Sequence, residues 1–259
     1  MKTILFPIAL FAWCTAPQLT VISFAHSFFW IWLHLLQFCV SNQYLSPHED
    51  ALNKPWRPIP ACRVTIREAT ILRWLLLPIC LALSAAHRVL PIGATLAIGI
   101  LMHNELRLDS HWFTRNVLNA IGYAVFDAGA TAIARTDPSN ELSPMALSAH
   151  YLSIAIVFTT IHAQDFRDED GDRQARRRTI PIVMPEVGRL SMPLGLLVWS
   201  FTLGMFDLPP IISISLVAMG GLVGLRFYCM RTVDADKTSY LLYNLWLATA
   251  RISPVYAQR

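Results

Sequence analysis

Residues 209–228 read PPIISISLVAMGGLVGLRFY, and residues 18–40 read QLTVISFAHSFFWIWLHLLQFCV. Each stretch is close to the roughly 20 residues that an α-helix needs to cross the hydrocarbon core of a bilayer. Similar apolar runs recur along the 259 residues, of which 54% are hydrophobic and only 15% are charged. Such a composition lies outside ordinary soluble usage. The sequence therefore predicts a multi-pass integral membrane protein embedded in the lipid bilayer.

The apolar runs, and the breaks that proline, glycine and charge supply, set the expected helices. They fall at 3–16, 18–44, 66–87, 90–108, 112–134, 143–164, 189–206, 209–230 and 237–256. The apolar segments are continuous rather than alternating, which excludes a transmembrane β-barrel, and open sheet edges cannot face lipid. We expect one all-α domain over residues 1–259, a bundle of about nine transmembrane helices. The first sixteen residues also fit a secretory signal, but we favour a short first helix because a second apolar segment follows at once.

Basic residues are distributed unevenly between the expected loops. Most Lys and Arg residues flank the ends of the even-numbered helices, whereas the loops after the third and fifth helices hold only Arg88 and Arg135. By the positive-inside rule the basic loops face the cytoplasm, and we expect the endoplasmic reticulum as the compartment. The formal charge of +4 does not indicate nucleic-acid binding, because no basic stripe with interleaved aromatics occurs. No protein partner is indicated.

A first polar segment, NQYLSPHEDALNKPWRPIP, covers residues 42–60. Asn42, Ser46 and Asp50 are spaced by four residues, which would place them on one helical face with Glu49 beside them. Magnesium takes hard oxygen ligands, and carboxylates inside a membrane bundle are costly without such a use. We interpret Asn42, Glu49 and Asp50 as candidate metal ligands. The alternative is a solvated helix end in which the carboxylates pair with nearby basic side chains.

A second, acidic segment, QDFRDEDGDRQARRRTIP, covers residues 164–181. Asp165, Asp168 and Asp172 follow at spacings of three and four, again one helical face, whereas Asp170 falls off that face and should be solvated. The three aspartates are candidate metal ligands, and the alternative is a solvated linker of mixed charge. The candidate catalytic residues drawn from both segments are Asn42, Asp50, Asp165 and Asp168.

Basic side chains lie close to both acidic segments in the sequence. A diphosphate needs bridging cations and hydrogen-bond donors together, which explains why basic residues accompany metal ligands. We therefore expect Mg²⁺ as the cofactor and a diphosphate on the substrate. The candidate diphosphate-binding residues in these segments are Lys54, Arg57, Arg63 and Arg177. A further candidate is Lys237 before the last helix, where the alternative is an ordinary solvated turn that contains Asp234, Asp236 and Lys237.

These two segments resemble the motifs of the UbiA superfamily of intramembrane prenyltransferases, N-D-x-x-D-x-x-x-D and D-x-x-D-x-x-G-D. Residues 53–65, NKPWRPIPACRVT, and the TIP sequence at 179–181 resemble the continuations of these motifs. Gln43 and Ser46 stand where the prenyltransferase motif has its first two aspartates. That variant, and the run NELRLDSHWFTRNVLNAIGYAVFDAGA at 104–130, resemble the fungal UbiA-type terpene cyclases.

The resemblance implies nine helices around a central cavity, with magnesium ions joining the acidic motifs to a prenyl diphosphate. It favours a terpene cyclase that ionises geranylgeranyl or farnesyl diphosphate and releases diphosphate. One alternative is a prenyltransferase that moves the prenyl group to an aromatic or other acceptor. A second is a non-catalytic transporter or lipid-binding membrane protein. Aromatic faces can stabilise an allylic cation, and the candidate lining residues are Trp112, Tyr123, Phe126 and Tyr151.

Overall fold

The computed structural model describes residues 2–137 and 141–256. The longer helices are α1 (Lys2–Thr15), α2 (Val21–Leu45), α4 (Ile66–Ala86), α5 (Leu90–Ile100), α6 (Trp112–Ala134), α7 (Pro144–Thr160), α10 (Pro185–Gly204), α11 (Pro210–Cys229) and α12 (Val233–Tyr256). Each of the nine predicted ranges overlaps one of them. The largest difference is at α5, which ends at Ile100 rather than at 108 because a π-helical turn follows it. Helix α10 begins at Pro185 rather than at 189, in agreement with the preference for proline in the first helical turn.

Short helical elements connect the longer ones near the polar segments. They are α3 (Pro47–Asn53), α8 (Glu169–Gln174), α9 (Ile180–Val183), the π-helix η1 (Leu101–Glu105), and the 3₁₀ turns η2 (Leu108–Ser110), η3 (Ile161–Gln164) and η4 (Phe166–Asp168). Within the described ranges the secondary structure is helical, apart from one isolated bridge between His111 and Arg178. The all-α prediction is confirmed for these residues.

Among residues 2–137 and 141–256, six helical segments are long and apolar enough to cross a membrane. They are α2, α4, α6, α10, α11 and the run Pro144–Gln174, which begins with α7. Many large apolar side chains on their outer faces are exposed, for example Phe201 at 60% and Leu222 at 57%. A soluble domain would bury such residues, whereas lipid accommodates them. The protein is a polytopic, multi-pass integral membrane bundle.

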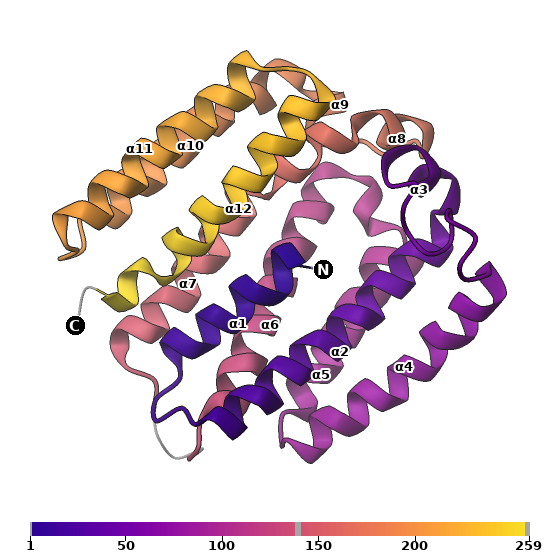
Figure 1. Ribbon diagram of the computed structural model, residues 1–259, viewed down its shortest axis with the longest axis horizontal. Helices are drawn as coiled ribbons and strands as arrows, with labels where there is room; N and C mark the ends of the chain where they lie inside the picture. Colours follow the sequence, from indigo (N-terminus) through magenta and orange to yellow (C-terminus); the bar gives the residue numbers. More distant parts are fainter. Residues whose placement is uncertain (1, 138–140, 257–259) are drawn as a thin grey trace.

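The helices form a layered bundle in which most chain neighbours pack against each other (Figure 1). The α10 and α11 hairpin lies at one edge of the view and α4 at the opposite edge, and α1 crosses the middle between α12 and α2. The core between them contains Trp30, Trp246 and Phe11, all completely buried. The short helices α3 and α8 pack together at one end of the bundle, which brings the two polar segments side by side.

Two buried ion pairs join α12 to its neighbours. Arg189 of α10 donates to both carboxylate oxygens of Asp236, at 2.6 and 2.9 Å. Arg251 donates through Nη2 to both carboxylate oxygens of Asp127 of α6, and through Nε to Ser153 of α7 at 2.7 Å. Breaking a buried pair by removing one partner leaves an uncompensated charge and costs about 3–5 kcal/mol. These pairs therefore fix the position of α12 in the bundle.

The predicted single helical face for Asn42, Ser46 and Asp50 is wrong. Helix α2 ends at Leu45, Ser46 leaves helical geometry with φ −129° and ψ 48°, and α3 begins at Pro47. Proline disfavours helical geometry in the residue before it and is well placed at the start of a new helix. Asn42 therefore belongs to α2, and Asp50 to α3.

The second predicted face, over Asp165, Asp168 and Asp172, is also not one α-helix. After α7 the chain tightens into η3 and η4 before α8 begins. A 3₁₀ turn has three residues per turn rather than 3.6, so side-chain directions shift along the segment. All three aspartates are nevertheless buried, whereas Asp170 is exposed as predicted.

Candidate functional site

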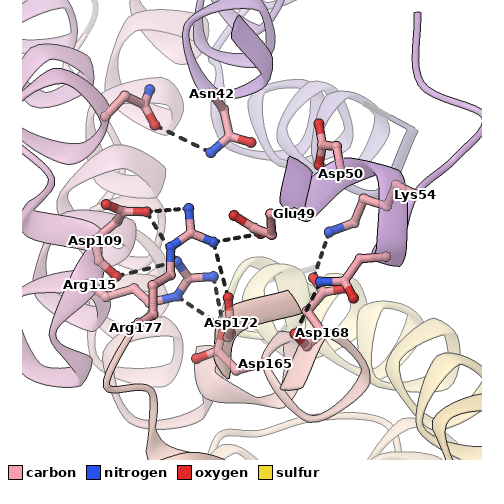
Figure 2. Close-up of polar contacts among 12 residues, drawn as sticks. Asn42, Glu49, Asp50, Lys54, Asp109, Arg115, Asp165, Asp168, Asp172 and Arg177 are labelled. Carbon is pink, nitrogen blue, oxygen red and sulfur yellow. Dashed lines mark hydrogen bonds and ion pairs between the residues drawn. The ribbon is translucent and has the colours of Figure 1, made fainter. Parts of the chain in front are cut away.

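Three chain segments form a buried polar cluster at the α3 and α8 end of the bundle (Figure 2). The end of α2 and α3 supply Asn42, Glu49 and Asp50, and the segment from η3 to α8 supplies the three aspartates Asp165, Asp168 and Asp172. The third segment, η2 and the start of α6, supplies Asp109 and Arg115. The structure thus places the six candidate metal ligands at the same end of the bundle.

Arg177 lies at the centre of this cluster and joins all three segments. Its guanidinium lies 2.6 Å from Glu49, 2.9 Å from Asp109 and 3.0 Å from Asp172 (Figure 2). The side chain is only 9% exposed. Charge-assisted bonds of this length are the strong class of hydrogen bond. Of the three consecutive arginines 176–178, Arg177 is the buried one, which agrees with its choice as the candidate.

Lys54 and Arg57 contact the acidic segments separately. Lys54 Nζ donates to Asp168 at 2.7 Å, so it crosses from the first segment to the second. Arg57 donates to Asp50 at 2.6 Å and to Asn42 Oδ1 at 3.3 Å, within the first segment. In the first segment, Asp50 is the carboxylate that pairs with a basic side chain of the same segment, as a solvated helix end would predict. Asp50 is nevertheless only 1% exposed, so it is not solvated.

Asp109 and Arg115 belong to the cluster although the motif spacings did not indicate them. Arg115 lies 2.9 Å from Asp165 and 3.7 Å from Asp109. Both belong to residues 104–130, which resemble the fungal cyclases as one stretch. Neither residue is part of an acidic motif, so the sequence did not indicate either of them individually. Their contacts depend on how α6 packs against η3, which is a tertiary relationship.

Four carboxylates in the cluster each keep one buried oxygen without a hydrogen-bond partner in the described part of the chain. The atoms are Oε2 of Glu49 and Oδ2 of Asp50, Asp165 and Asp172. A buried acceptor without a partner costs free energy, and carboxylate oxygens are the ligands that Mg²⁺ prefers. By the chemistry of its donors, this set fits a hard divalent cation.

The present arrangement of these carboxylates is nevertheless held by basic side chains. Among the described residues no three His, Cys, Asp or Glu side chains converge closely enough to hold a metal ion. The reason is visible in Figure 2, where Arg177 lies between Glu49 and Asp172 and Lys54 lies against Asp168. Cation binding would require these side chains to move.

The surroundings raise the pKa of two groups in the cluster that lie outside the spanning helices. Desolvation raises the pKa of Glu49, an effect that nearby Asp172 reinforces and that Arg177 and Lys54 oppose. The carboxylates of Asp109, Glu49 and Asp172 outweigh burial and raise the pKa of Arg177. Arg177 is therefore a permanent cation, and Glu49 holds its proton to a higher pH than an exposed glutamate.

Two predicted diphosphate-binding residues lie apart from the described contacts of the cluster. The Arg63 side chain is exposed in the turn before α4. Lys237 is exposed at the start of α12 and pairs with Asp234 at 2.9 Å. Neither has a described hydrogen bond or ion pair to the acidic segments, so their roles stay predictions. Of the proposed lining aromatics, Tyr123 and Phe126 are buried, whereas Tyr151 is 65% exposed.

Comparison with known proteins was made for both sequence and structure. Residues 4–248 match the model of the UbiA prenyltransferase family. The chain is 32% identical to the fumagillin beta-trans-bergamotene synthase of Aspergillus fumigatus, over 88% of this chain and 79% of that protein. It is 29% identical to the diterpene cyclase eriG of Hericium erinaceus, over 83% of this chain and 70% of that protein.

The fold is similar to that of a UbiA homolog from Archaeoglobus fulgidus whose structure was solved with GPP and Mg²⁺. The TM-score is 0.63 at 15% sequence identity, covering 96% of this chain and 93% of that one. The family model spans nearly the whole chain, and the first relative exceeds 30% identity over most of it. The resemblance stated from the two motifs is thus confirmed, and this chain belongs to the UbiA prenyltransferase family.

Proposed function

We propose that this protein is a Mg²⁺-dependent membrane terpene cyclase that ionises a linear prenyl diphosphate, geranylgeranyl or farnesyl diphosphate, and cyclises it with release of diphosphate. The observation that carries the proposal is the set of four unpartnered, buried carboxylate oxygens on Glu49, Asp50, Asp165 and Asp172. These oxygens lie in the same cluster as Lys54 and Arg177, which supply cationic donors (Figure 2). The proximity of candidate metal ligands and candidate phosphate-binding cations supports a site for a metal-bound diphosphate.

The residues that would hold magnesium come from both acidic segments: Asn42, Glu49, Asp50, Asp165, Asp168 and Asp172. When bound, Mg²⁺ acts as a Lewis acid that neutralises charge on the departing diphosphate. Lys54, Arg57 and Arg177 bind diphosphate oxygens by charge-assisted hydrogen bonds and hold the group in position. Arg63 and Lys237 are proposed as outer contacts of the same group.

The proposed reaction breaks the bond between the allylic carbon and the diphosphate oxygen. The bonding electron pair leaves with the oxygen, and the prenyl chain becomes an allylic cation. Apolar walls exclude water that would quench this cation, and aromatic rings such as Tyr123 and Phe126 stabilise it. A double bond of the same chain then supplies electrons for ring closure, and loss of a proton ends the reaction.

The first acidic segment supports cyclisation over transfer to an acceptor. Gln43 and Ser46 replace two carboxylates of the prenyltransferase motif, and the two relatives described above bear the names of terpene cyclases. The prenyltransferase activity remains the second candidate because the family is described by that name. In either case we propose one domain over residues 1–259, nine spanning helices and an active site that faces the cytoplasm from the endoplasmic reticulum membrane.

The two candidates differ in whether an acceptor is required. Membranes that contain the protein are incubated with farnesyl or geranylgeranyl diphosphate and Mg²⁺, without an aromatic acceptor, and hexane extracts are examined by gas chromatography and mass spectrometry. We expect a cyclic terpene that is absent from membranes with the Asp168→Ala variant. A prenylated product that forms only after an aromatic acceptor is added would replace the cyclase proposal with the prenyltransferase.

A further inference from the structure

A second buried polar network lies beside the acidic cluster, between the end of α2, helix α4 and the π-helix η1. Glu105, the last residue of η1, accepts hydrogen bonds from Arg73 Nε at 2.8 Å and from Ser41 Oγ at 2.9 Å. Arg73 belongs to α4 and Ser41 to α2, and both side chains are completely buried. Ionisable side chains inside a membrane bundle are costly and mark functional regions. None of these three residues takes part in the proposed reaction.

The network places two consecutive residues of α2 against two consecutive residues of η1. Ser41 bonds to Glu105, and the next residue, Asn42, donates through Nδ2 to Oδ1 of Asn104 at 3.4 Å. Single π-helical turns occur frequently at functional sites. Here the turn holds Asn104 next to Asn42, one of the candidate magnesium ligands.

The side chain of Asn104 acts as an acceptor toward both of its described partners. Its Oδ1 accepts from Asn42 and lies 3.0 Å from Nδ1 of His103. Its own Nδ2 is buried and has no hydrogen-bond partner among the described residues, which costs free energy. The reverse orientation would direct this nitrogen at the amide nitrogen of Asn42, donor against donor. The observed orientation therefore serves Asn42 rather than the hydrogen bonding of Asn104 itself.

The orientation of Asn42 matters because a side-chain amide has one atom suited to a hard cation. That atom is the carbonyl oxygen, since the amide nitrogen is a hydrogen-bond donor. With Nδ2 bonded to Asn104, Oδ1 of Asn42 is directed the other way, where Arg57 donates to it at 3.3 Å (Figure 2). Arg57 also donates to Asp50 at 2.6 Å. The oxygen of Asn42 thus faces the acidic cluster.

We infer that Asn104 is a positioning residue of the metal site, which accepts a hydrogen bond from Nδ2 of Asn42 and so fixes this amide with its oxygen toward the cation. The bonds of Glu105 to Arg73 and Ser41 hold η1 where Asn104 can make this contact. The inference rests on the magnesium site of the proposed function. Partners that orient metal ligands in this way typically contribute about 10- to 100-fold to metal affinity.

The test measures metal binding rather than turnover. The full-length protein in phosphatidylcholine nanodiscs is titrated with Mn²⁺, a spectroscopic substitute for Mg²⁺, and bound ion is followed by electron paramagnetic resonance. Asn104→Leu removes the acceptor at similar volume, whereas Asn104→Asp retains an acceptor. Asn244→Leu is the matched control, because Asn244 is also a buried asparagine and donates to the backbone oxygen of Tyr240 within α12. Asp165→Asn reports whether the ion is bound at the acidic cluster.

We expect Asn104→Leu to weaken Mn²⁺ binding by about 10- to 100-fold. Asn104→Asp should retain most of the affinity, and Asn244→Leu should leave it unchanged. Thermal unfolding without metal shows whether each variant is folded, and Asn104→Ala gives the same comparison if the leucine variant is not.

A double-mutant cycle with Asn42→Asp separates orientation from a general structural effect. A carboxylate presents an oxygen to the cation in either orientation and has no N–H group that needs an acceptor. Asn104→Leu should therefore cost little affinity in the Asn42→Asp background. A role of Asn104 in folding alone would give the same loss in both backgrounds.

An equal loss from Asn104→Leu in the two backgrounds, or no loss in either, would overturn the inference. Wild-type protein that binds no Mn²⁺, or binds it equally well after Asp165→Asn, would overturn both the inference and the proposed magnesium site. If the expected pattern is found but the protein releases no diphosphate from farnesyl or geranylgeranyl diphosphate, the proposed function fails and the role of Asn104 stands.

Discussion

The guanidinium of Arg177 lies 2.6 Å from the carboxylate of Glu49, so the chain that follows the second acidic segment contacts the first segment directly. Glu49 belongs to α3, and Arg177 follows α8, more than a hundred residues later. Arg177 also pairs with Asp172 and Asp109, so this cation joins the acidic segments together with the pair between Lys54 and Asp168. We propose two functions for Arg177, which are to hold the site together before substrate arrives and to bind the diphosphate afterwards.

Replacing Arg177 should impair catalysis and also lower stability, because Glu49, Asp109 and Asp172 would lose their buried cationic partner. In Arg177→Gln we expect kcat for diphosphate release to fall by about 100-fold or more, since a donor aimed at developing negative charge is lost. Arg177→Lys should retain the charge without the forked geometry and give an intermediate rate. The matched control is Arg173→Gln, because Arg173 is exposed and pairs only with Glu169 among the described contacts. Equal losses in Arg173→Gln and Arg177→Gln would contradict a specific role for Arg177.

Magnesium affinity should depend on the protonation of Glu49. Burial raises the pKa of this carboxyl above its ordinary value, and a metal ion binds only the ionised form. As pH falls through the raised pKa, protons compete with Mg²⁺ and the apparent affinity decreases; at higher pH the competition ends. Titration of diphosphate release with Mg²⁺ at several mildly acidic pH values measures this trend.

Glu49→Gln provides the comparison for that pH series. The variant should bind Mg²⁺ more weakly at neutral pH and lose the part of the pH dependence that Glu49 contributes. The pKa of Glu49 is higher in the folded protein than in the unfolded chain. As pH rises from the unfolded-state pKa to the folded-state pKa, loss of this proton therefore lowers the stability of the metal-free protein. An affinity for Mg²⁺ that is independent of pH in wild type would count against Glu49 as a ligand.

The contact between α3 and α8 should tolerate no side chain at Gly171. A Cβ at this position would lie 2.2 Å from Nδ2 of Asn53, which donates to the backbone oxygen of Asp168 at 3.1 Å. In Gly171→Ala the two short helices must separate, at a cost of about 1–3 kcal/mol. We expect lower thermal stability in detergent and a higher KM for the prenyl diphosphate.

Gly221→Ala is the control for this prediction, because its added Cβ would make only an ordinary contact at 3.5 Å with Leu197. The double variant Asn53→Ala with Gly171→Ala restores space and should recover part of the stability. Failure of the double variant to improve on Gly171→Ala would show that the clash is not the cause.

The buried pair between Arg251 and Asp127 should stabilise the bundle without a part in the acidic cluster. Both side chains are almost completely buried. Arg251→Met leaves Asp127 unpaired and should destabilise the protein by about 3–5 kcal/mol. Removing both charges in Arg251→Met with Asp127→Leu should restore much of the loss in thermal unfolding experiments. A double variant less stable than the single one would argue that the pair itself is favourable.

The sequence predicted the helices well because long apolar runs bounded by proline, glycine and charge leave few alternatives in a membrane. The helix break at Ser46 was not predicted, although Pro47 indicates it. The four-residue spacing of Asn42, Ser46 and Asp50 was given more weight than the proline. Helical spacing describes only residues that share one helix. Here the side chains converge because separate short helices pack together.

The contacts between side chains in the acidic cluster were harder to predict from the sequence than which residues belong to it. Arg177 rather than its neighbours is buried because Arg176 adopts a left-handed φ of 55° that turns the chain. Asp109 and Arg115 carry no motif and reach the cluster only through the packing of α6. Asp236, expected to be a solvated turn residue, is instead buried by its pair with Arg189 across two helices. Such contacts depend on distances between elements that residue spacing does not contain.

The most direct test of the central claim is the release of diphosphate from farnesyl or geranylgeranyl diphosphate by the purified protein, measured with and without Mg²⁺ and without any acceptor. The proposed mechanism predicts release that requires Mg²⁺, equals the amount of cyclic product, and falls by at least about 100-fold in Asp165→Asn and Asp172→Asn. Release that continues unchanged in these variants, or no release from either substrate with Mg²⁺ present, would contradict the assignment of this cluster as the ionising site.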